Sequence, residues 1–135
     1  MARSGQVLLF VNALAFISFG VYALLYTGEL ATLLGADAIG VGGLYELRSN
    51  YGGVSIGAGV LLLIGALNTR WRRAALVFLL TYMGGYVVGR TSALAFGAWP
   101  PSQLLAFGAF EAVMAMLALL CLRATSAAPA DADTR

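Results

Sequence analysis

Four apolar stretches of membrane-spanning length are the feature that most constrains this chain. They cover residues 6–27, 48–67, 74–94 and 103–122, and each is close to the ~20 residues that an α-helix needs to cross ~30 Å of hydrocarbon. Only 10% of the residues are charged and 61% are apolar, whereas soluble domains carry about a quarter charged residues. A water-soluble fold of 135 residues could not bury so much apolar surface. The sequence therefore predicts an all-α integral membrane protein, a single four-helix bundle in the lipid bilayer.

The first apolar stretch has one competing interpretation, a cleavable signal peptide. Arg3 supplies a positive start, and Ala13-Leu14-Ala15 resembles a cleavage site. The apolar core before that site is only a handful of residues, and the hydrophobic character continues well beyond it. Retention as the first transmembrane helix is therefore the preferred interpretation.

The segments between the spans are less regular. Between residues 28 and 47, Leu30, Leu33 and Leu34 could form one face of a short interfacial helix, although an irregular loop is an equal alternative. Residues 68–73 predict a short polar turn. Residues 124–135 are rich in Ala, Asp and Thr and predict a disordered tail.

The arginines predict how the bundle is oriented. All eight basic residues are arginine, and six of them fall on one side of a four-span arrangement: Arg3, Arg70, Arg72, Arg73, Arg123 and Arg135. Positively charged loops stay on the cytoplasmic side. We therefore expect both termini to lie in the cytoplasm, with the protein in a bacterial inner membrane.

Four charges lie within or at the ends of the apolar stretches: Glu46, Arg48, Arg90 and Glu111. An ion in hydrocarbon is costly, so such residues often mark a functional site. With a rise of 1.5 Å per residue, Arg90 lies roughly 6 Å and Glu111 roughly 12 Å below the outer boundary of the membrane. The pattern predicts one polar cluster in the outer leaflet whose charges sum to zero.

Glu111 is the central residue of this predicted cluster. One hypothesis is a carboxylate that titrates or binds a ligand in a polar cavity; the other is a structural ion pair with Arg90 that fixes the third and fourth helices. The candidate ligand- or proton-binding residues are Glu46, Arg48, Asn50, Tyr51, Tyr86, Arg90 and Glu111.

Glycine spacing predicts close helix packing. Three pairs of small residues are each four positions apart: Gly53 and Gly57, Gly85 and Gly89, and Gly108 and Ala112. Small residues at this spacing let helix backbones approach closely in lipid. The spacing leaves open whether these faces meet within one chain or between two chains.

Several classes of chemistry are not expected. The chain has no histidine, no lysine and a single cysteine, Cys121, which leaves neither the usual metal ligands nor the usual general bases. We expect no metal, no cofactor, no nucleic-acid partner and no enzymatic activity.

Two stretches and one further residue carry a resemblance to a known family: Glu46-Leu47-Arg48-Ser49-Asn50-Tyr51-Gly52-Gly53-Val54-Ser55-Ile56-Gly57-Ala58-Gly59, Gly85-Tyr86-Val87-Val88-Gly89-Arg90, and Glu111. In these positions the chain resembles the DUF4345 family of small bacterial membrane proteins. The resemblance spans about residues 45–120. It implies a four-helix membrane protein with no established biochemical role.

Two functions remain for the charged cluster. The first is a non-enzymatic component that forms homo-oligomers or serves as an accessory subunit of a larger membrane complex. The alternative is a small proton-coupled transporter, or a protein that binds a small ligand or lipid, through Glu111 and Arg90.

Overall fold

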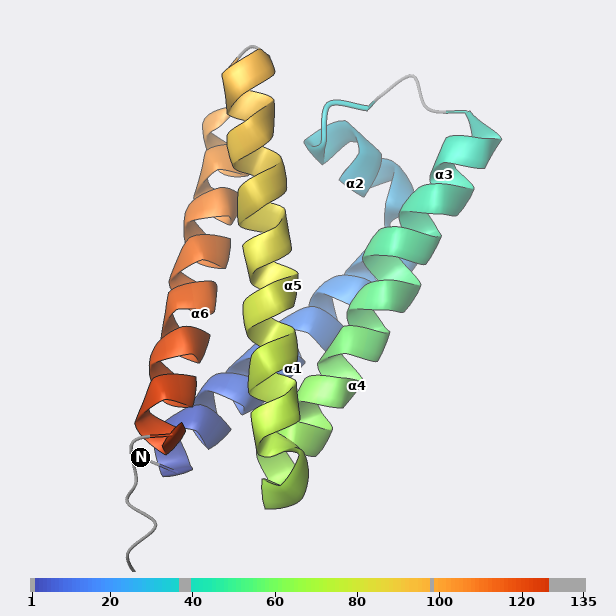
Figure 1. The fold of residues 1–135 in the computed structure, drawn as a ribbon. Coiled ribbons are helices and arrows are strands. Elements are labelled where there is room, and N and C mark those ends of the chain that lie inside the picture. Colours follow the sequence, from blue (N-terminus) through green and yellow to red (C-terminus); the bar gives the residue numbers. More distant parts are fainter. Residues whose placement is uncertain (1, 37–39, 98, 127–135) are drawn as a thin grey trace, which may run out of the picture.

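The structure is a computed structural model that describes residues 2–36, 40–97 and 99–126. Its helices are α1 (Ala2–Leu25), α2 (Thr27–Leu33), α3 (Val41–Leu47), α4 (Val54–Leu67), α5 (Thr69–Phe96) and α6 (Ser102–Ser126), with a π-helical segment η1 (Arg48–Gly53) between α3 and α4 (Figure 1). Four stretches are long and apolar enough to cross a membrane: Arg3–Leu25, Val41–Leu67, Thr69–Phe96 and Ser102–Thr125. The predicted all-α fold with four candidate membrane spans is confirmed.

Two helices begin earlier than the predicted spans. The helical stretch of the second candidate span begins at Val41, before the predicted start at residue 48, because α3, η1 and α4 follow one another without a break. The helix of the third begins at Thr69, before the predicted start at residue 74, so most of the predicted polar turn 68–73 is helical. Asn68 explains this early start, since its side chain accepts a hydrogen bond from the Arg70 backbone N–H at 3.0 Å and so caps α5.

The segment after the first span forms a short helix rather than an irregular loop. α2 covers Thr27–Leu33, and Leu30 is buried within it. At the other end of the chain, α6 continues to Ser126, which corrects the start of the predicted tail. The rest of that tail, residues 127–135, lies outside the described residues.

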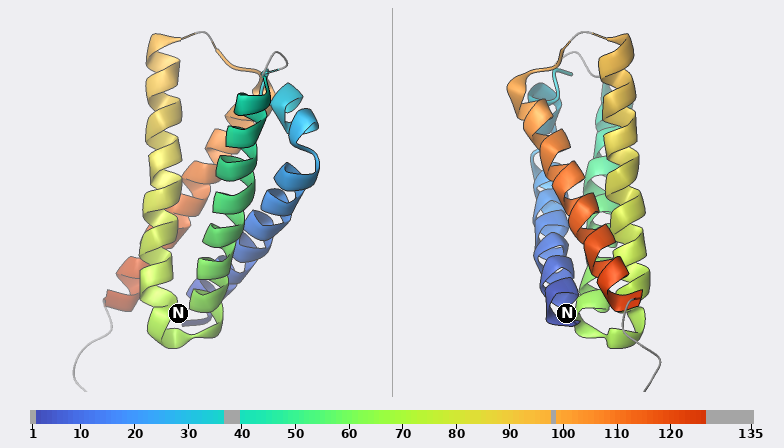
Figure 2. Two further views of the ribbon diagram at one scale, coloured as in Figure 1. Left: turned by 90° about the vertical axis from the view of Figure 1, so that its right-hand side faces the viewer. Right: turned by 60° about the vertical axis from the view of Figure 1, so that its left-hand side comes forward.

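The long helices form two pairs. α1 packs mainly against α4, and α5 packs mainly against α6 (Figures 1 and 2). The start of α1, the α4–α5 turn and the end of α6 lie together at one end of the bundle, whereas α2 and α3 lie at the other end, toward which the pairs diverge. The buried core joins both pairs near the first end; its members are Leu9, Ala13, Leu62, Ala66, Ala75, Leu76, Leu79, Met83 and Ala118.

Glycines do bring α1 and α4 together, but they are not the predicted ones. A Cβ at Gly59 would lie 2.9 Å from the Ala13 carbonyl oxygen, and a Cβ at Gly20 would lie 2.8 Å from the Gly52 carbonyl oxygen. Such contacts leave no room for a side chain, so these glycines set the distance between the helices.

The predicted packing glycines need a correction within this chain. A Cβ at Gly53, Gly57, Gly85 or Gly89 would meet nothing within 4 Å. Only Gly108 among the predicted set has a close neighbour, the Cδ of Arg90 at 3.1 Å from the position of a Cβ. Spacing alone does not reveal which way a helix is turned about its axis.

Candidate ligand-binding site

Arg90 on α5 and Glu111 on α6 form a two-point ion pair. The Arg90 Nε lies 2.6 Å from Glu111 Oε2, and the Arg90 Nη2 lies 2.9 Å from Glu111 Oε1. Glu111 is 8% exposed, and the side chain of Arg90 is 35% exposed. Parallel N–H···O bonds of this kind fix the orientation of both groups. Gly108 makes the approach feasible, because a side chain there would crowd the Arg90 methylenes.

This ion pair borders a cavity of about 640 Å³ between the two helix pairs. Residues of α1, α2, η1, α4, α5 and α6 line it. Most of the wall is apolar, and its apolar side chains include Phe16, Phe19, Leu30, Leu33, Phe107 and Phe110. The leucine face predicted for the interfacial segment, Leu30, Leu33 and Leu34, is therefore part of this wall.

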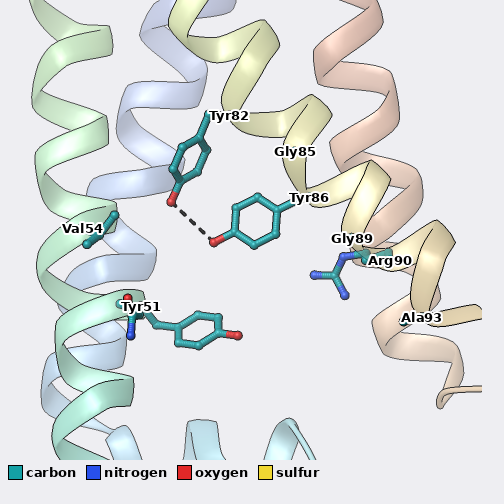
Figure 3. A pocket seen from close by; sticks show the side chains of 9 residues that line it. Tyr51, Val54, Tyr82, Gly85, Tyr86, Gly89, Arg90 and Ala93 are labelled. Carbon is teal, nitrogen blue, oxygen red and sulfur yellow. Dashed lines mark hydrogen bonds between the residues drawn. The ribbon is translucent and has the colours of Figure 1, made fainter. Parts of the chain in front are cut away.

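A second pocket of about 570 Å³ lies between α5 and the η1–α4 segment (Figure 3). Gly85, Gly89 and Ala93 of α5 line it, together with Asn50 and Val54. The small residues of α5 thus border open space rather than a closely packed helix of the described chain.

Tyr51, Tyr86 and Arg90 line both pockets and separate them. Figure 3 shows the side chain of Tyr51 reaching across the gap toward α5, with Tyr86 above it. The hydroxyls of Tyr82 and Tyr86 are 3.5 Å apart, and the Arg90 guanidinium carbon lies 6.0 Å from the centre of the Tyr86 ring. Ring contacts and hydroxyls therefore surround the exposed side of the ion pair.

The π-helical segment explains the position of Tyr51. A π turn inserts an extra residue into a helix and changes the direction of the side chains around it, often at a functional site. In η1, Gly52 contacts Leu24 of α1, while the neighbouring Tyr51 lines the two pockets. The Tyr51 ring also meets Phe19 edge to face, with 6.3 Å between ring centres. The sequence pattern did not predict this segment.

Asn12 of α1 is a site residue that the sequence analysis missed. It lines the larger cavity and is 1% exposed. Its Nδ2 donates to the Leu8 carbonyl oxygen at 2.8 Å and to the Met114 sulfur at 3.4 Å, whereas its Oδ1 has no hydrogen-bond partner in the described parts of the chain. The available signal was an amide in the middle of an apolar span, where polar groups are costly.

The predicted four-charge cluster is divided in the structure. Glu46 and Arg48 do not line the cavity that holds the Arg90–Glu111 pair. The Arg48 Nε donates to the Thr27 hydroxyl at 3.0 Å, and the Asn50 amide donates to the Glu46 carboxylate at 3.3 Å on the exposed surface. Glu46 and Arg48 therefore make contacts of their own, within a helix that begins at Val41, before the predicted helix end at Arg48.

The site has no arrangement typical of a metal centre. Over residues 2–36, 40–97 and 99–126, no group of three or more acidic, histidine or cysteine side chains could hold a metal ion. The side chains of the site can instead form hydrogen bonds and apolar contacts. The polar groups are one ion pair, tyrosine hydroxyls and a buried amide, and the apolar groups are aromatic and leucine side chains.

The comparison with protein families identifies the chain. The family model described as a domain of unknown function (DUF4345) matches residues 4–122, so this chain belongs to the DUF4345 family. No curated protein and no solved structure matches it. With its four candidate spans, it is a multi-span membrane protein of unknown function.

Proposed function

We propose that this DUF4345 protein binds a small amphipathic molecule from the bilayer and holds it between its two helix pairs, without catalysing a reaction. The observation that carries the proposal is the cavity of about 640 Å³ whose apolar wall is interrupted by the Arg90–Glu111 pair. Small-molecule sites are typically ~300–1,000 Å³, mostly apolar and fitted with a few polar groups. Both the size and the lining of this cavity have that character.

The position of the cavity favours a ligand that arrives through the lipid. Its walls belong to the candidate membrane spans and to α2. The phenylalanines of α1 and α6 offer apolar contact, while the Arg90–Glu111 pair and a few other polar side chains, such as Asn12, offer polar contact. A molecule with a polar group and an apolar body suits both parts. The polar groups of a fully polar solute would instead lie against the apolar wall without hydrogen-bond partners, which is costly.

The orientation is part of the proposal. The arginine-rich end of the bundle, formed by the start of α1, the start of α5 and the end of α6, is proposed to face the cytoplasm of a bacterial cell. The cavity would then lie in the outer half of the inner membrane. A molecule of the outer leaflet would reach it without crossing the bilayer.

The test uses one pair of substitutions on the same helix. Ala106 and Ala109 are both exposed, but only Ala106 lines the cavity. Ala106→Phe should fill the cavity and remove lipid-like molecules that co-purify with the protein, as measured by mass spectrometry of extracted ligand per protein. Ala109→Phe should leave that ratio unchanged. Equal ligand content in both variants would contradict the proposal.

Self-association remains a second candidate with one observation in its favour. Gly85 and Gly89 border a pocket rather than a neighbouring helix of the same chain. Small residues on an open face suit contact with a helix of a second copy or of a larger complex. A light-scattering mass of one protomer in several mild detergents would count against it.

Proton coupling is not proposed, because Glu111 is already held by two hydrogen bonds from Arg90.

A further inference from the structure

We infer that the ligand of the larger cavity is an uncharged amphiphile that donates a hydrogen bond, such as a long-chain alcohol, and that Asn12 accepts this bond. The inference rests on the proposed function and adds the chemical class of the ligand's polar group. Two independent observations support it: the unpartnered oxygen of Asn12 and the mutual neutralisation of Arg90 and Glu111.

The state of Asn12 is the first observation. Its side chain is almost fully buried beside the cavity, its Nδ2 is engaged, and its Oδ1 lacks a partner in the described parts of the chain. A buried acceptor without a donor is costly. Each such group in a native structure calls for a water or a ligand that satisfies it.

The surroundings of Asn12 let this oxygen reach a ligand. Its long-range contact is with the Met114 sulfur at 3.4 Å, and a thioether is a weak acceptor. When the amide turns toward the cavity, Nδ2 gives up its bonds to the Leu8 carbonyl oxygen and the Met114 sulfur, and Oδ1 can gain the donor that it lacks. Asn12 lines the cavity, so a hydroxyl or N–H of a ligand held there can donate to this oxygen.

The charge balance of the cavity is the second observation. Arg90 and Glu111 are the charged residues in its described lining, and each uses two atoms to bind the other. A carboxylate or phosphate ligand would bring a charge without a free counter-ion, or would have to break this pair. Burying a charged group without a counter-ion is strongly disfavoured. The polar group that fits is therefore uncharged.

The shape of the cavity places the rest of such a ligand. Asn12 contacts Met114, and Gln103 of the lining lies eleven residues earlier on the same helix. That separation is about 16 Å along α6 at 1.5 Å per residue. An alkyl chain with its hydroxyl at Asn12 would extend past the phenylalanines of α6 toward α2.

The experiment compares three probes with the same chain and different polar groups: dodecanol, dodecyl methyl ether and dodecanoate. Full-length protein in immobilised nanodiscs is titrated with each radiolabelled probe, and binding to empty nanodiscs is subtracted. Dodecanol should bind about tenfold more tightly than the ether, the size of one well-placed hydrogen bond. Dodecanoate should bind no more tightly than the ether.

Asn12→Leu then tests the residue. It should reduce the alcohol-to-ether affinity ratio to about one while leaving the ether affinity unchanged, because Leu has a similar size but no acceptor. Val11→Leu, an exposed neighbour, should keep the wild-type ratio. A wild-type ratio near one, tighter binding of dodecanoate, or a ratio that survives Asn12→Leu would each overturn the inference.

Failure of the proposed function has a different signature. In that case none of the three probes would bind wild-type protein above empty nanodiscs, and Ala106→Phe would have no effect on any of them. If Asn12→Leu did not fold, the ratios measured on wild-type protein would still decide the class of ligand.

Discussion

The contact between α1 and α4 allows a quantitative prediction with an internal control. Gly57 and Gly59 lie two residues apart on α4, and each can be replaced by alanine. A Cβ at Gly57 meets nothing within 4 Å, whereas a Cβ at Gly59 would lie 2.6 Å from Ile17 Cγ1 and 2.9 Å from the Ala13 carbonyl oxygen. The same added methyl group therefore enters open space in one variant and the backbone of α1 in the other.

The expected difference in unfolding free energy follows from comparing the two variants. Replacing a helical glycine by alanine gains ~0.8–1 kcal/mol of helix propensity at either position, so this contribution cancels in the comparison. Carbon contacts are optimal at ~3.5–4.0 Å, so α1 must move away from position 59. Overpacking of this kind costs about 1–3 kcal/mol. We expect Gly59→Ala to be less stable than Gly57→Ala by that amount.

The assay is the free energy of unfolding in mixed micelles, measured by circular dichroism against the mole fraction of sodium dodecyl sulfate. Gly57→Ala should be as stable as wild type or slightly more stable, and Gly59→Ala should be less stable than both. Equal stability of the two variants would refute the α1–α4 register. A loss at Gly57 together with a lower oligomer mass would show that this face packs against a second chain.

Two further predictions concern the site. Arg90→Leu should destabilise the protein by about 3–5 kcal/mol, because it leaves the buried Glu111 carboxylate without a partner. Glu111→Leu should cost less, because the Arg90 side chain is 35% exposed, and the double variant should recover most of the Arg90→Leu loss; in the same micelle assay, additive losses would contradict a direct pair. Asn12→Leu should raise the stability of ligand-free protein by about 1–3 kcal/mol, since it removes a buried acceptor that has no donor; a large loss would show that the Asn12 oxygen is already bonded.

The sequence predicts the spans and the ion pair well for clear physical reasons. A length of ~20 apolar residues has few uses other than crossing a membrane. Arg90 and Glu111 were predicted to differ by roughly 6 Å in depth on two successive helices, and successive helices joined by a short connection pack side by side. Depth and adjacency made a direct contact with Arg90 one of the two hypotheses for Glu111, and the structure has that contact.

Features that depend on helix rotation were predicted less well. Gly53 and Gly57 have the spacing of a packing motif, yet Gly52 and Gly59, seven residues apart, are the ones that contact α1. The π-helical segment shifts the side chains within this stretch, and nothing in the local composition marks it. The open cavity was beyond prediction for a similar reason, since it depends on how far the helix pairs diverge.

Packing and binding are placed at opposite ends of this bundle. The core that joins the two pairs is built of small and branched apolar residues near the α4–α5 turn, among them Ala66, Ala75 and Leu79. At the other end the pairs diverge, and α2 contributes Leu30 and Leu33 to the cavity wall instead of completing a core. The close contacts of Gly20 and Gly59 hold α1 against the η1–α4 segment, and the Arg90–Glu111 pair joins α5 to α6. Substitutions of core residues near the turn should therefore change stability first, whereas substitutions of small apolar residues of the cavity wall, such as Ala106, should change ligand binding first.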